Sequence, residues 1–335
     1  MPKAPQQLLG LWDLRTMPVS LGGVITFVGD LHTRAAGQRE RLGGVCFVGD
    51  DAHRLASLGP PEDGAATRLD DKVCAAVPSL AALLSLEGID SLYYGHGLHS
   101  ARLLIEESLG GTSTWPQLGV SDDGAISYEY GTTFNIQDAY AALGEVTSFG
   151  SKEPALRWAH TFLVDQVRPA TAVAVHLRNQ SGAQSGSNAD LVAWAGFIGR
   201  AQAFNDVCFV LLGNEELGDV LPGLSNVILS RDFGATIAED LALVQICDAF
   251  MGMASGPCNM AIFTDRPYVI FKNPTDHAEH IQREIGDAER FSFAMPNQKL
   301  LRVSETDEWL MAEFEALYAA VGGAVPAQSR RARDN

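Results

Sequence analysis

The chain has 335 residues, which exceeds the needs of one ordinary domain and predicts two domains of about 150 residues each. A hydrophobic fraction of 46% is enough to fill two cores. The formal net charge is −17, from 41 acidic and 24 basic side chains. A field of that sign repels nucleic acid and anionic membrane surfaces, so any phosphate-bearing ligand needs a local site.

Cysteine usage and hydropathy point to a cytoplasmic protein. The five cysteines are scattered and form no CxxC pair, which indicates buried thiols in a reducing compartment and neither a disulfide framework nor a zinc site. No stretch approaches the roughly 18 apolar residues of a membrane span. The amino terminus lacks the apolar core of a signal peptide. We therefore expect no integral membrane segment.

The first half of the chain predicts three strands and two helical segments. In chain order these are a strand over 7–15, an amphipathic segment over 24–39, a strand over 43–49, a helix over 72–86 and a strand over 91–95. Gly22 and Gly23 follow the first strand, where a βα turn brings the backbone close to another group. Asp30 is expected on the solvated face of the amphipathic segment.

The second half alternates strands and helices more regularly. Strands are predicted over 172–177, 207–212, 226–229, 249–252 and 268–271, and helices over 153–167, 189–203, 236–247, 257–264 and 305–321. The expected helix N-caps are Ser187 or Asn188, Thr236 with Glu239 in a capping box, and Ser304. This alternation predicts an α/β protein with parallel sheets flanked by helices, divided into domains over 1–150 and 151–325 and a flexible tail over 326–335.

A candidate anion site lies at Ser255, Gly256 and Pro257, after a strand and at the start of a helix. Proline suits a first helical position, and Gly256 lets the backbone approach a ligand. The free N–H groups and the Ser255 hydroxyl would then meet one anion, with the positive end of the helix behind them. Ligands of open parallel sheets bind at this edge. An ordinary βα turn with a capping serine would show the same residues.

A second candidate lies at the end of the strand over 172–177. His176 and Arg178 share one side of the pleat because alternate residues of a strand face the same way. Arg178 would lie at the same edge of the sheet as Ser255, where a guanidinium can neutralise a diphosphate through two parallel hydrogen bonds. The alternative is a surface arginine beside a core histidine.

Together, His176-Leu177-Arg178, the segment from Asp240 to Gly252 and the Ser255 loop resemble the carboxyl-terminal domain of GT-B glycosyltransferases. The fucosyltransferase-like and heptosyltransferase-like groups come closest, over residues 170–272. The resemblance implies two Rossmann-like domains. It also implies that Arg178 binds the donor's β-phosphate, as in the fucosyltransferases, and that the Ser255 loop cradles the diphosphate. The chain departs from the fucosyltransferases at Asn179, where they carry a second basic residue.

Further positions complete the expected site. Gly22 and Gly23 sit where GT-B enzymes place a glycine loop facing the interdomain cleft. Asn179 and Gly213 follow strands of the donor domain, and Asp240 is a candidate contact to a ribose. His96, after the strand over 91–95, is a candidate general base for an acceptor hydroxyl, although a loop histidine also serves as ordinary polar surface.

The resemblance implies a metal-independent transfer of a sugar from a nucleotide-diphosphate donor to a glycan, lipid-linked or protein acceptor. The donor is a substrate, and no cofactor and no metal are expected. Arg178 and the Ser255 loop would neutralise the leaving diphosphate in place of a metal ion, with His176 beside them. Two alternatives stay open: a nucleotide-sugar epimerase or hydrolase of the same fold, and a non-catalytic protein that binds a sugar nucleotide or a partner.

Overall fold

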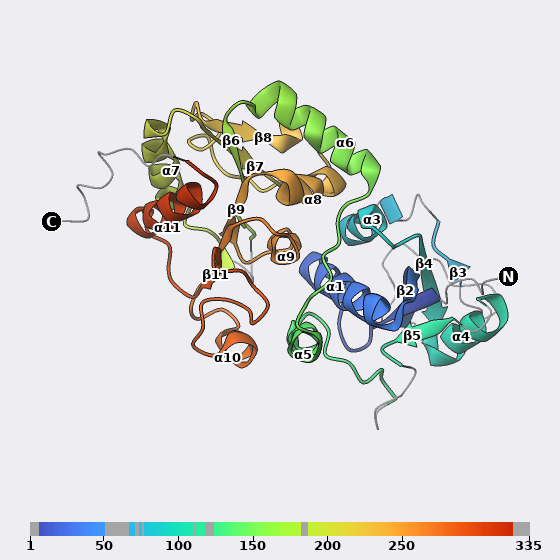
Figure 1. The fold of residues 1–335 in the computed structure, drawn as a ribbon. Coiled ribbons are helices and arrows are strands. Elements are labelled where there is room, and N and C mark those ends of the chain that lie inside the picture. The colour runs from blue at the N-terminus through green and yellow to red at the C-terminus, as the bar shows by residue number, and fades with distance from the viewer. Residues whose placement is uncertain are drawn as a thin grey trace. The chain divides into compact units, whose positions relative to one another are not determined.

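The computed structural model describes residues 7–50, 67–70, 74–75, 77–109, 112–117, 124–181 and 187–323. The tail expected over 326–335 lies outside these residues. The chain divides into two compact units, Met1–Lys152 and Glu153–Asn335, and each unit is built on its own sheet (Figure 1). Within the described ranges, no helix is both long enough and apolar enough to cross a membrane.

The amino-terminal unit holds a sheet in the order β3-β4-β2-β1-β5. All neighbours in this sheet pair in parallel except β3, which runs antiparallel to β4. The strands are β1 (Gln7–Asp13), β2 (Arg41–Gly49), β3 (Thr67–Arg68), β4 (Ser91–His96) and β5 (Ser113–Trp115). The helices include α1 (Leu21–Gln38), α3 (Pro78–Ser85), α4 (Gly97–Leu103) and α5 (Phe134–Leu143), and a π-helical turn covers Leu104–Ser108.

The carboxyl-terminal unit holds a fully parallel sheet in the order β11-β10-β9-β6-β7-β8. Its strands are β6 (Thr171–His176), β7 (Val207–Leu211), β8 (Val227–Leu229), β9 (Ala249–Met253), β10 (Tyr268–Phe271) and β11 (Gln298–Leu301). Its helices include α6 (Glu153–Phe162), α7 (Leu191–Arg200), α8 (Ile237–Ile246), α9 (Cys258–Ile262), α10 (Ala278–Ile285) and α11 (Asp307–Ala320). The parallel sheet with covering helices confirms the predicted fold class.

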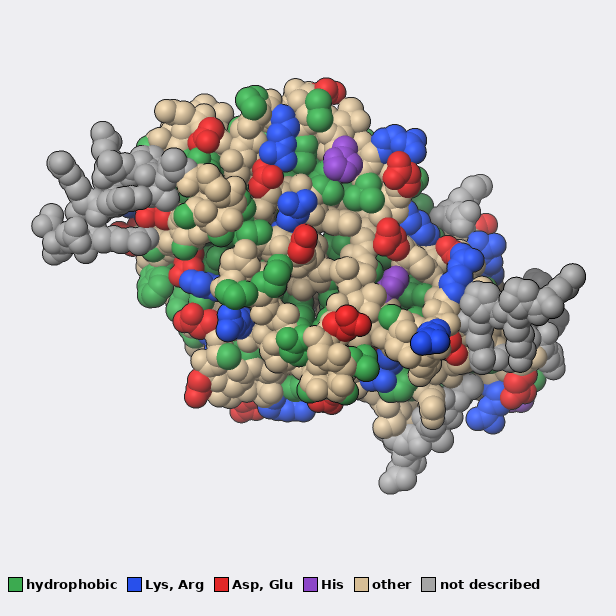
Figure 2. Space-filling model, in the orientation of Figure 1, with side chains coloured by type: hydrophobic (Ala, Val, Ile, Leu, Met, Phe, Trp, Pro, Cys, Tyr) green, Lys and Arg blue, Asp and Glu red, His purple; other side chains and the backbone are tan. Residues whose placement is uncertain are grey.

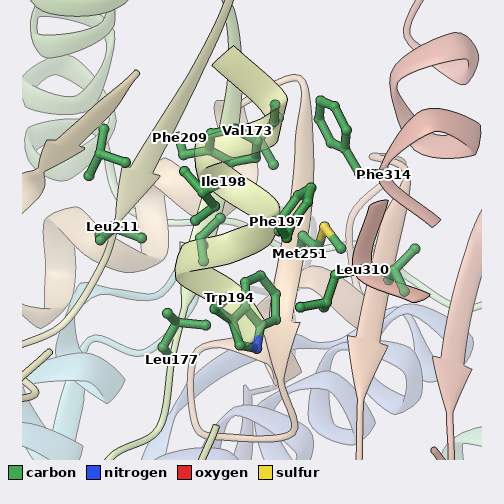
Figure 3. Close-up of a cluster of buried hydrophobic side chains, with 14 of the residues drawn as sticks. Val173, Leu177, Trp194, Phe197, Ile198, Phe209, Leu211, Met251, Leu310 and Phe314 are labelled. Atoms are coloured by element: carbon green, nitrogen blue, oxygen red, sulfur yellow. The ribbon is translucent and has the colours of Figure 1, made fainter. Parts of the chain in front are cut away.

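Aromatic side chains fill the core on one face of the carboxyl-terminal sheet (Figure 3). Trp194 and Phe197 of α7 and Phe314 of α11 are fully buried there, and Phe197 stacks edge-on against Phe209 of β7. Because β6, β7, β9 and β10 are buried on both faces, their sequences are apolar runs without polar alternation. Packing in this core therefore fixes the positions of these strands and of the points where the following loops begin.

Helix boundaries follow their caps, and two expected caps were wrong. Helix α7 begins after Asp190, whose carboxylate accepts hydrogen bonds from the N–H groups of Val192 and Ala193 at 3.1 and 3.0 Å. Asn188 instead bonds the backbone of Gln180. Thr306 caps α11 in place of Ser304.

The capping box at the start of α8 is confirmed. The Thr236 hydroxyl accepts from the backbone, and the Glu239 carboxylate accepts from the Thr236 N–H at 2.9 Å. The strands β5 and β11 were not predicted, because strands of three or four residues carry little periodicity. The ten-residue helix α5 was not predicted either.

Asp30 is buried, which corrects the expectation that it lies on a solvated face. Its carboxylate accepts hydrogen bonds from Trp115 Nε1 at 2.6 Å, from the Tyr128 hydroxyl at 2.9 Å and from Arg34 Nε at 3.1 Å. The guanidinium of Arg34 also stacks on the Trp115 ring, 3.3 Å from its centroid. A buried charge is tolerated here because each carboxylate oxygen has a donor.

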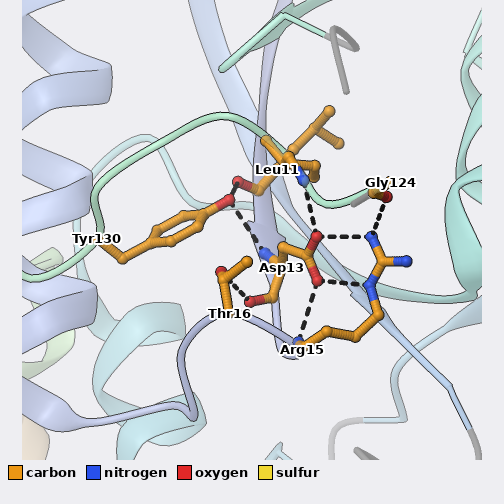
Figure 4. Close-up of polar contacts among 7 residues, drawn as sticks. Leu11, Asp13, Arg15, Thr16, Gly124 and Tyr130 are labelled. Carbon is orange, nitrogen blue, oxygen red and sulfur yellow. Dashed lines mark hydrogen bonds and ion pairs between the residues drawn. The ribbon is translucent and has the colours of Figure 1, made fainter. Parts of the chain in front are cut away.

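A second buried carboxylate lies at the carboxyl end of β1 (Figure 4). Asp13 is fully buried and forms a two-point ion pair with Arg15, at 2.8 and 2.6 Å. The backbone N–H groups of Arg15 and Ile126 also donate to it, at 3.0 and 2.9 Å. Burial favours the neutral carboxyl, but the hydrogen bonds and the charge of Arg15 outweigh it and lower the pKa of Asp13 below its ordinary value.

Basic and acidic side chains are mixed on the surface that Figure 2 shows. On the face drawn in Figure 2, the described Lys and Arg side chains lie scattered among Asp and Glu side chains and do not form one basic patch. This face therefore offers no broad basic surface to a ligand that carries phosphate.

Candidate functional site

The candidate site lies at the carboxyl edge of the β6–β11 sheet. Strand β6 ends at His176, β7 ends two residues before Gly213, and β9 ends two residues before Ser255. These strands run parallel, so their ends meet at one edge. Gly252 faces His176 across the β6–β9 pair, where any larger residue would collide with the backbone carbonyl of His176. The two strand ends are therefore held in close contact.

His176 connects the ends of two neighbouring strands. Its side chain is nearly buried. Its Nδ1 atom lies 2.7 Å from Oγ of Ser255, and its Nε2 atom lies 3.2 Å from Oε1 of Glu215. The Ser255 hydroxyl also lies 3.0 Å from the carbonyl oxygen of Met253. The imidazole thus lies between a carboxylate and a hydroxyl at the edge where ligands of such sheets bind.

Glu215 contacts His176 at this edge, although the sequence analysis did not predict it as a candidate residue. Burial raises the pKa of its carboxyl, but the hydrogen bond and charge of His176 outweigh burial and hold the pKa below its ordinary value. Arg231 Nη1 donates to the backbone carbonyl of Glu215 at 2.9 Å, which fixes the loop after β7. The signal in the sequence was a carboxylate two residues beyond the glycine that closes a buried strand.

Gly213 makes room for Glu215. Its φ of +85° is in the left-handed region that glycine favours. A Cβ atom there would overlap Oε2 of Glu215 and would lie 3.1 Å from Nε2 of His176. Gly213 therefore serves the packing of the Glu215–His176 pair.

Asp240, expected near a ribose, is bound within the protein. One carboxylate oxygen accepts from the Gly213 N–H at 2.9 Å and the other accepts from the Ser230 hydroxyl at 2.7 Å. Burial raises the pKa of this carboxyl, and these two hydrogen bonds act against the rise. Both oxygens already have protein donors, so Asp240 orders the loop after β7.

The Ser255 loop differs in detail from its prediction. The helix that follows, α9, has five residues, and Pro257 is its N-cap residue and not its first helical residue. The Ser255 N–H donates to Cys258 Sγ at 3.2 Å, and the Gly256 carbonyl accepts from Asn259. A helix this short contributes only a small dipole. The Ser255 hydroxyl, held by His176, is thus the main polar group of the loop.

Arg178 lies two residues beyond His176 and is half-buried. Its Nη2 atom lies 3.4 Å from the Gln180 amide oxygen. Asn179, next to it, donates to the backbone carbonyl of Glu216 and receives a hydrogen bond from Asn188 at 3.4 Å. Asn179 therefore joins the loops after β6 and β7.

A second cation lies at the same edge and was also missed. Lys272 follows β10, is nearly buried, and pairs with Asp276 at 2.6 Å. Lysine directly after a buried strand was the signal in the sequence. Within the described part of the chain, no three His, Cys, Asp or Glu side chains gather as a metal ion would require.

The remaining candidates belong to the amino-terminal unit. Gly22 and Gly23 lie inside the first turn of α1 and not in a loop before it, and the Ser20 hydroxyl caps that turn through the Gly23 N–H at 3.2 Å. A Cβ atom on Gly23 would lie 3.1 Å from the Trp12 ring, so this glycine allows α1 to pack on β1. His96 is the exposed last residue of β4.

No protein-family model and no curated protein matches the sequence of this chain. Solved structures do match its fold. ADP-heptose lps heptosyltransferase II of E. coli has a TM-score of 0.53 at 13% identity, over 95% of this chain and 100% of that one. That similarity covers both units, and it confirms the GT-B-like fold expected from the sequence.

Two other structures match with TM-scores below 0.5. The glycosyl transferase family 9 protein of Veillonella parvula DSM 2008 has a TM-score of 0.49 at 12% identity, over 96% of this chain and 91% of that one. POFUT1, in complex with GDP-fucose, has a TM-score of 0.41 at 9% identity, over 80% and 98%.

Proposed function

We propose that this protein is a glycosyltransferase that takes a sugar from a nucleotide-diphosphate donor. The observation that carries the proposal is the meeting of His176 and Ser255 at the carboxyl edge of a parallel sheet, with Arg178 on the adjoining loop. The fold supports it, because the similar E. coli structure is named for ADP-heptose. The carboxyl-terminal unit would bind the donor, and the amino-terminal unit would bind a glycan, lipid-linked or protein acceptor.

In this proposal the chemistry depends on neutralising the leaving diphosphate. As the glycosidic bond breaks, negative charge grows on the β-phosphate. The Arg178 guanidinium and the Ser255 hydroxyl would stabilise that charge without a metal ion. Gly256 would let the backbone approach the phosphates, and Gly213 and Asn179 would shape the adjoining loops. His96 remains a candidate base for the acceptor hydroxyl.

Product analysis tests the proposal and separates its alternatives. The protein is incubated with UDP-, ADP- and GDP-sugars, with and without extracts that contain glycan and lipid acceptors, and released nucleoside diphosphate and free sugar are measured. A glycosyltransferase releases nucleoside diphosphate faster when its acceptor is present. Release of free sugar alone indicates a hydrolase, and a changed sugar still attached to its nucleotide indicates an epimerase. Binding without consumption of any donor would contradict catalysis.

A further inference from the structure

A chain of three polar groups runs from Glu215 through His176 to Ser255. The two distances are 3.2 Å from Glu215 Oε1 to Nε2 and 2.7 Å from Nδ1 to Oγ. The Ser255 hydroxyl has one hydrogen and two acceptors within reach, the Nδ1 atom of His176 and the carbonyl oxygen of Met253. The protonation state of His176 decides which of them receives that hydrogen.

The Nε2 atom faces a carboxylate oxygen and therefore carries a hydrogen. In neutral His176 the Nδ1 atom is then bare and takes the Ser255 hydrogen, so the serine offers only lone pairs to a ligand. In the imidazolium, Nδ1–H donates to Oγ and the serine hydrogen is released. A phosphate oxygen accepts hydrogen bonds and repels lone pairs. It therefore favours the second state.

We propose that binding of a diphosphate at Ser255 is coupled to protonation of His176, with Glu215 as the positioning residue that supplies the counter-charge. The coupling rests on the diphosphate site proposed above. One proton moves from solvent to Nδ1 when the ligand binds, and it returns to solvent when the ligand leaves. No covalent bond of the ligand changes in this step.

Charged groups surround His176 in the structure. Glu215 contacts the ring directly, and Asp240 of α8 acts on it from behind Gly213. Both carboxylates favour a positive ring. Arg231 donates to the Glu215 backbone carbonyl, and Arg178 lies two residues beyond His176 along the chain. A diphosphate bound at Ser255 would add negative charge near the ring and favour the imidazolium.

Calorimetry tests the coupling in the intact protein. UDP-glucose, ADP-glucose and GDP-mannose are suitable probes because their bridging diphosphates do not titrate near neutral pH. Titration in buffers of different ionisation enthalpy between pH 6 and 8.5 gives the number of protons taken up. We expect uptake of up to one proton and an affinity that falls as pH rises, at most about tenfold per pH unit.

Three variants separate the roles. Glu215→Gln removes the counter-charge of the imidazolium and should weaken binding at pH 8 by about tenfold. Ser255→Ala should abolish proton uptake and keep residual binding. Glu216→Gln removes the same charge from the exposed neighbour and should keep the profile of the parent protein. If Glu215→Gln does not fold, NMR of the parent protein still tests the coupling, because the His176 ring should become imidazolium when the ligand binds.

The two hypotheses fail in different ways. Binding with no proton uptake and no pH dependence, or a His176 ring that stays neutral in the complex, would overturn the coupling and leave the donor site standing. An unchanged pH profile in Glu215→Gln would overturn the role of Glu215. If no probe binds the parent protein at any pH, the proposed function fails and the coupling fails with it.

Discussion

Gly213 leaves the space that the Glu215 carboxylate needs, because a Cβ atom on residue 213 would collide with Oε2 of Glu215. In this position Glu215 contacts His176, whose Nε2 atom lies 3.2 Å from Oε1 of Glu215. Gly213 therefore contributes to the candidate site by making room for the Glu215–His176 contact.

Gly213→Ala should therefore cost more than backbone strain. We expect its free energy of unfolding to fall by about 2–4 kcal/mol, because the residue keeps a left-handed φ and also displaces Glu215. Gly234→Ala is the matched control, since Gly234 has a φ of +82° and no atom within 4 Å of an added Cβ. It should lose only about 1 kcal/mol. Urea unfolding measures both, and equal losses would refute the close contact.

Arg178 is the residue whose loss should affect turnover most. Arg178→Ala should lower kcat by on the order of a hundredfold to a thousandfold, with a smaller effect on KM, because its charge would act mainly in the transition state. Arg178→Lys should recover little, since an ammonium cannot form two parallel hydrogen bonds. Arg157→Ala, in an exposed ion pair of α6, should keep the parent kinetics. A change within a few-fold in Arg178→Ala would favour the non-catalytic interpretation.

The Asp13–Arg15 pair should make stability depend on acid pH. The pKa of Asp13 is lower in the folded protein, so the pair stabilises fully above the ordinary pKa of 3.8 and the stabilisation disappears as pH falls through the folded value. Asp13→Asn should lose about 2–4 kcal/mol at pH 7, and the deficit should shrink below about pH 4. Denaturant unfolding of the parent protein and of Asp13→Asn at several pH values measures this difference in the free energy of unfolding.

The exposed pair of Arg41 and Asp90 provides the control for Asp13. Asp90→Asn should cost at most about 1 kcal/mol, because solvent screens that pair. Equal losses in Asp13→Asn and Asp90→Asn would show that burial does not strengthen the Asp13 pair.

The alternation of apolar runs with capped helices was enough to predict the parallel sheet of the carboxyl-terminal unit. The same pattern placed Ser255 and His176 at one edge, because strand ends of a parallel sheet coincide. Burial of Asp30 was not predictable, since its partners Trp115 and Tyr128 are 85 and 98 residues away. Glu215 was missed for a related reason: its role depends on a histidine brought next to it only by the pairing of β6 with β7.

We infer that the carboxyl edge of the β6–β11 sheet binds a nucleoside diphosphate without a metal ion. Thermal unfolding in excess EDTA, with UDP, ADP and GDP in turn, tests it most directly, because a ligand that binds only the folded state raises the Tm. We predict that at least one nucleoside diphosphate raises the Tm of the parent protein and that the rise is much smaller in Arg178→Ala and Ser255→Ala. The inference would be contradicted if none of the three nucleotides raised the Tm, or if a rise required a divalent ion. It would also be contradicted if both variants showed the same rise in Tm as the parent protein.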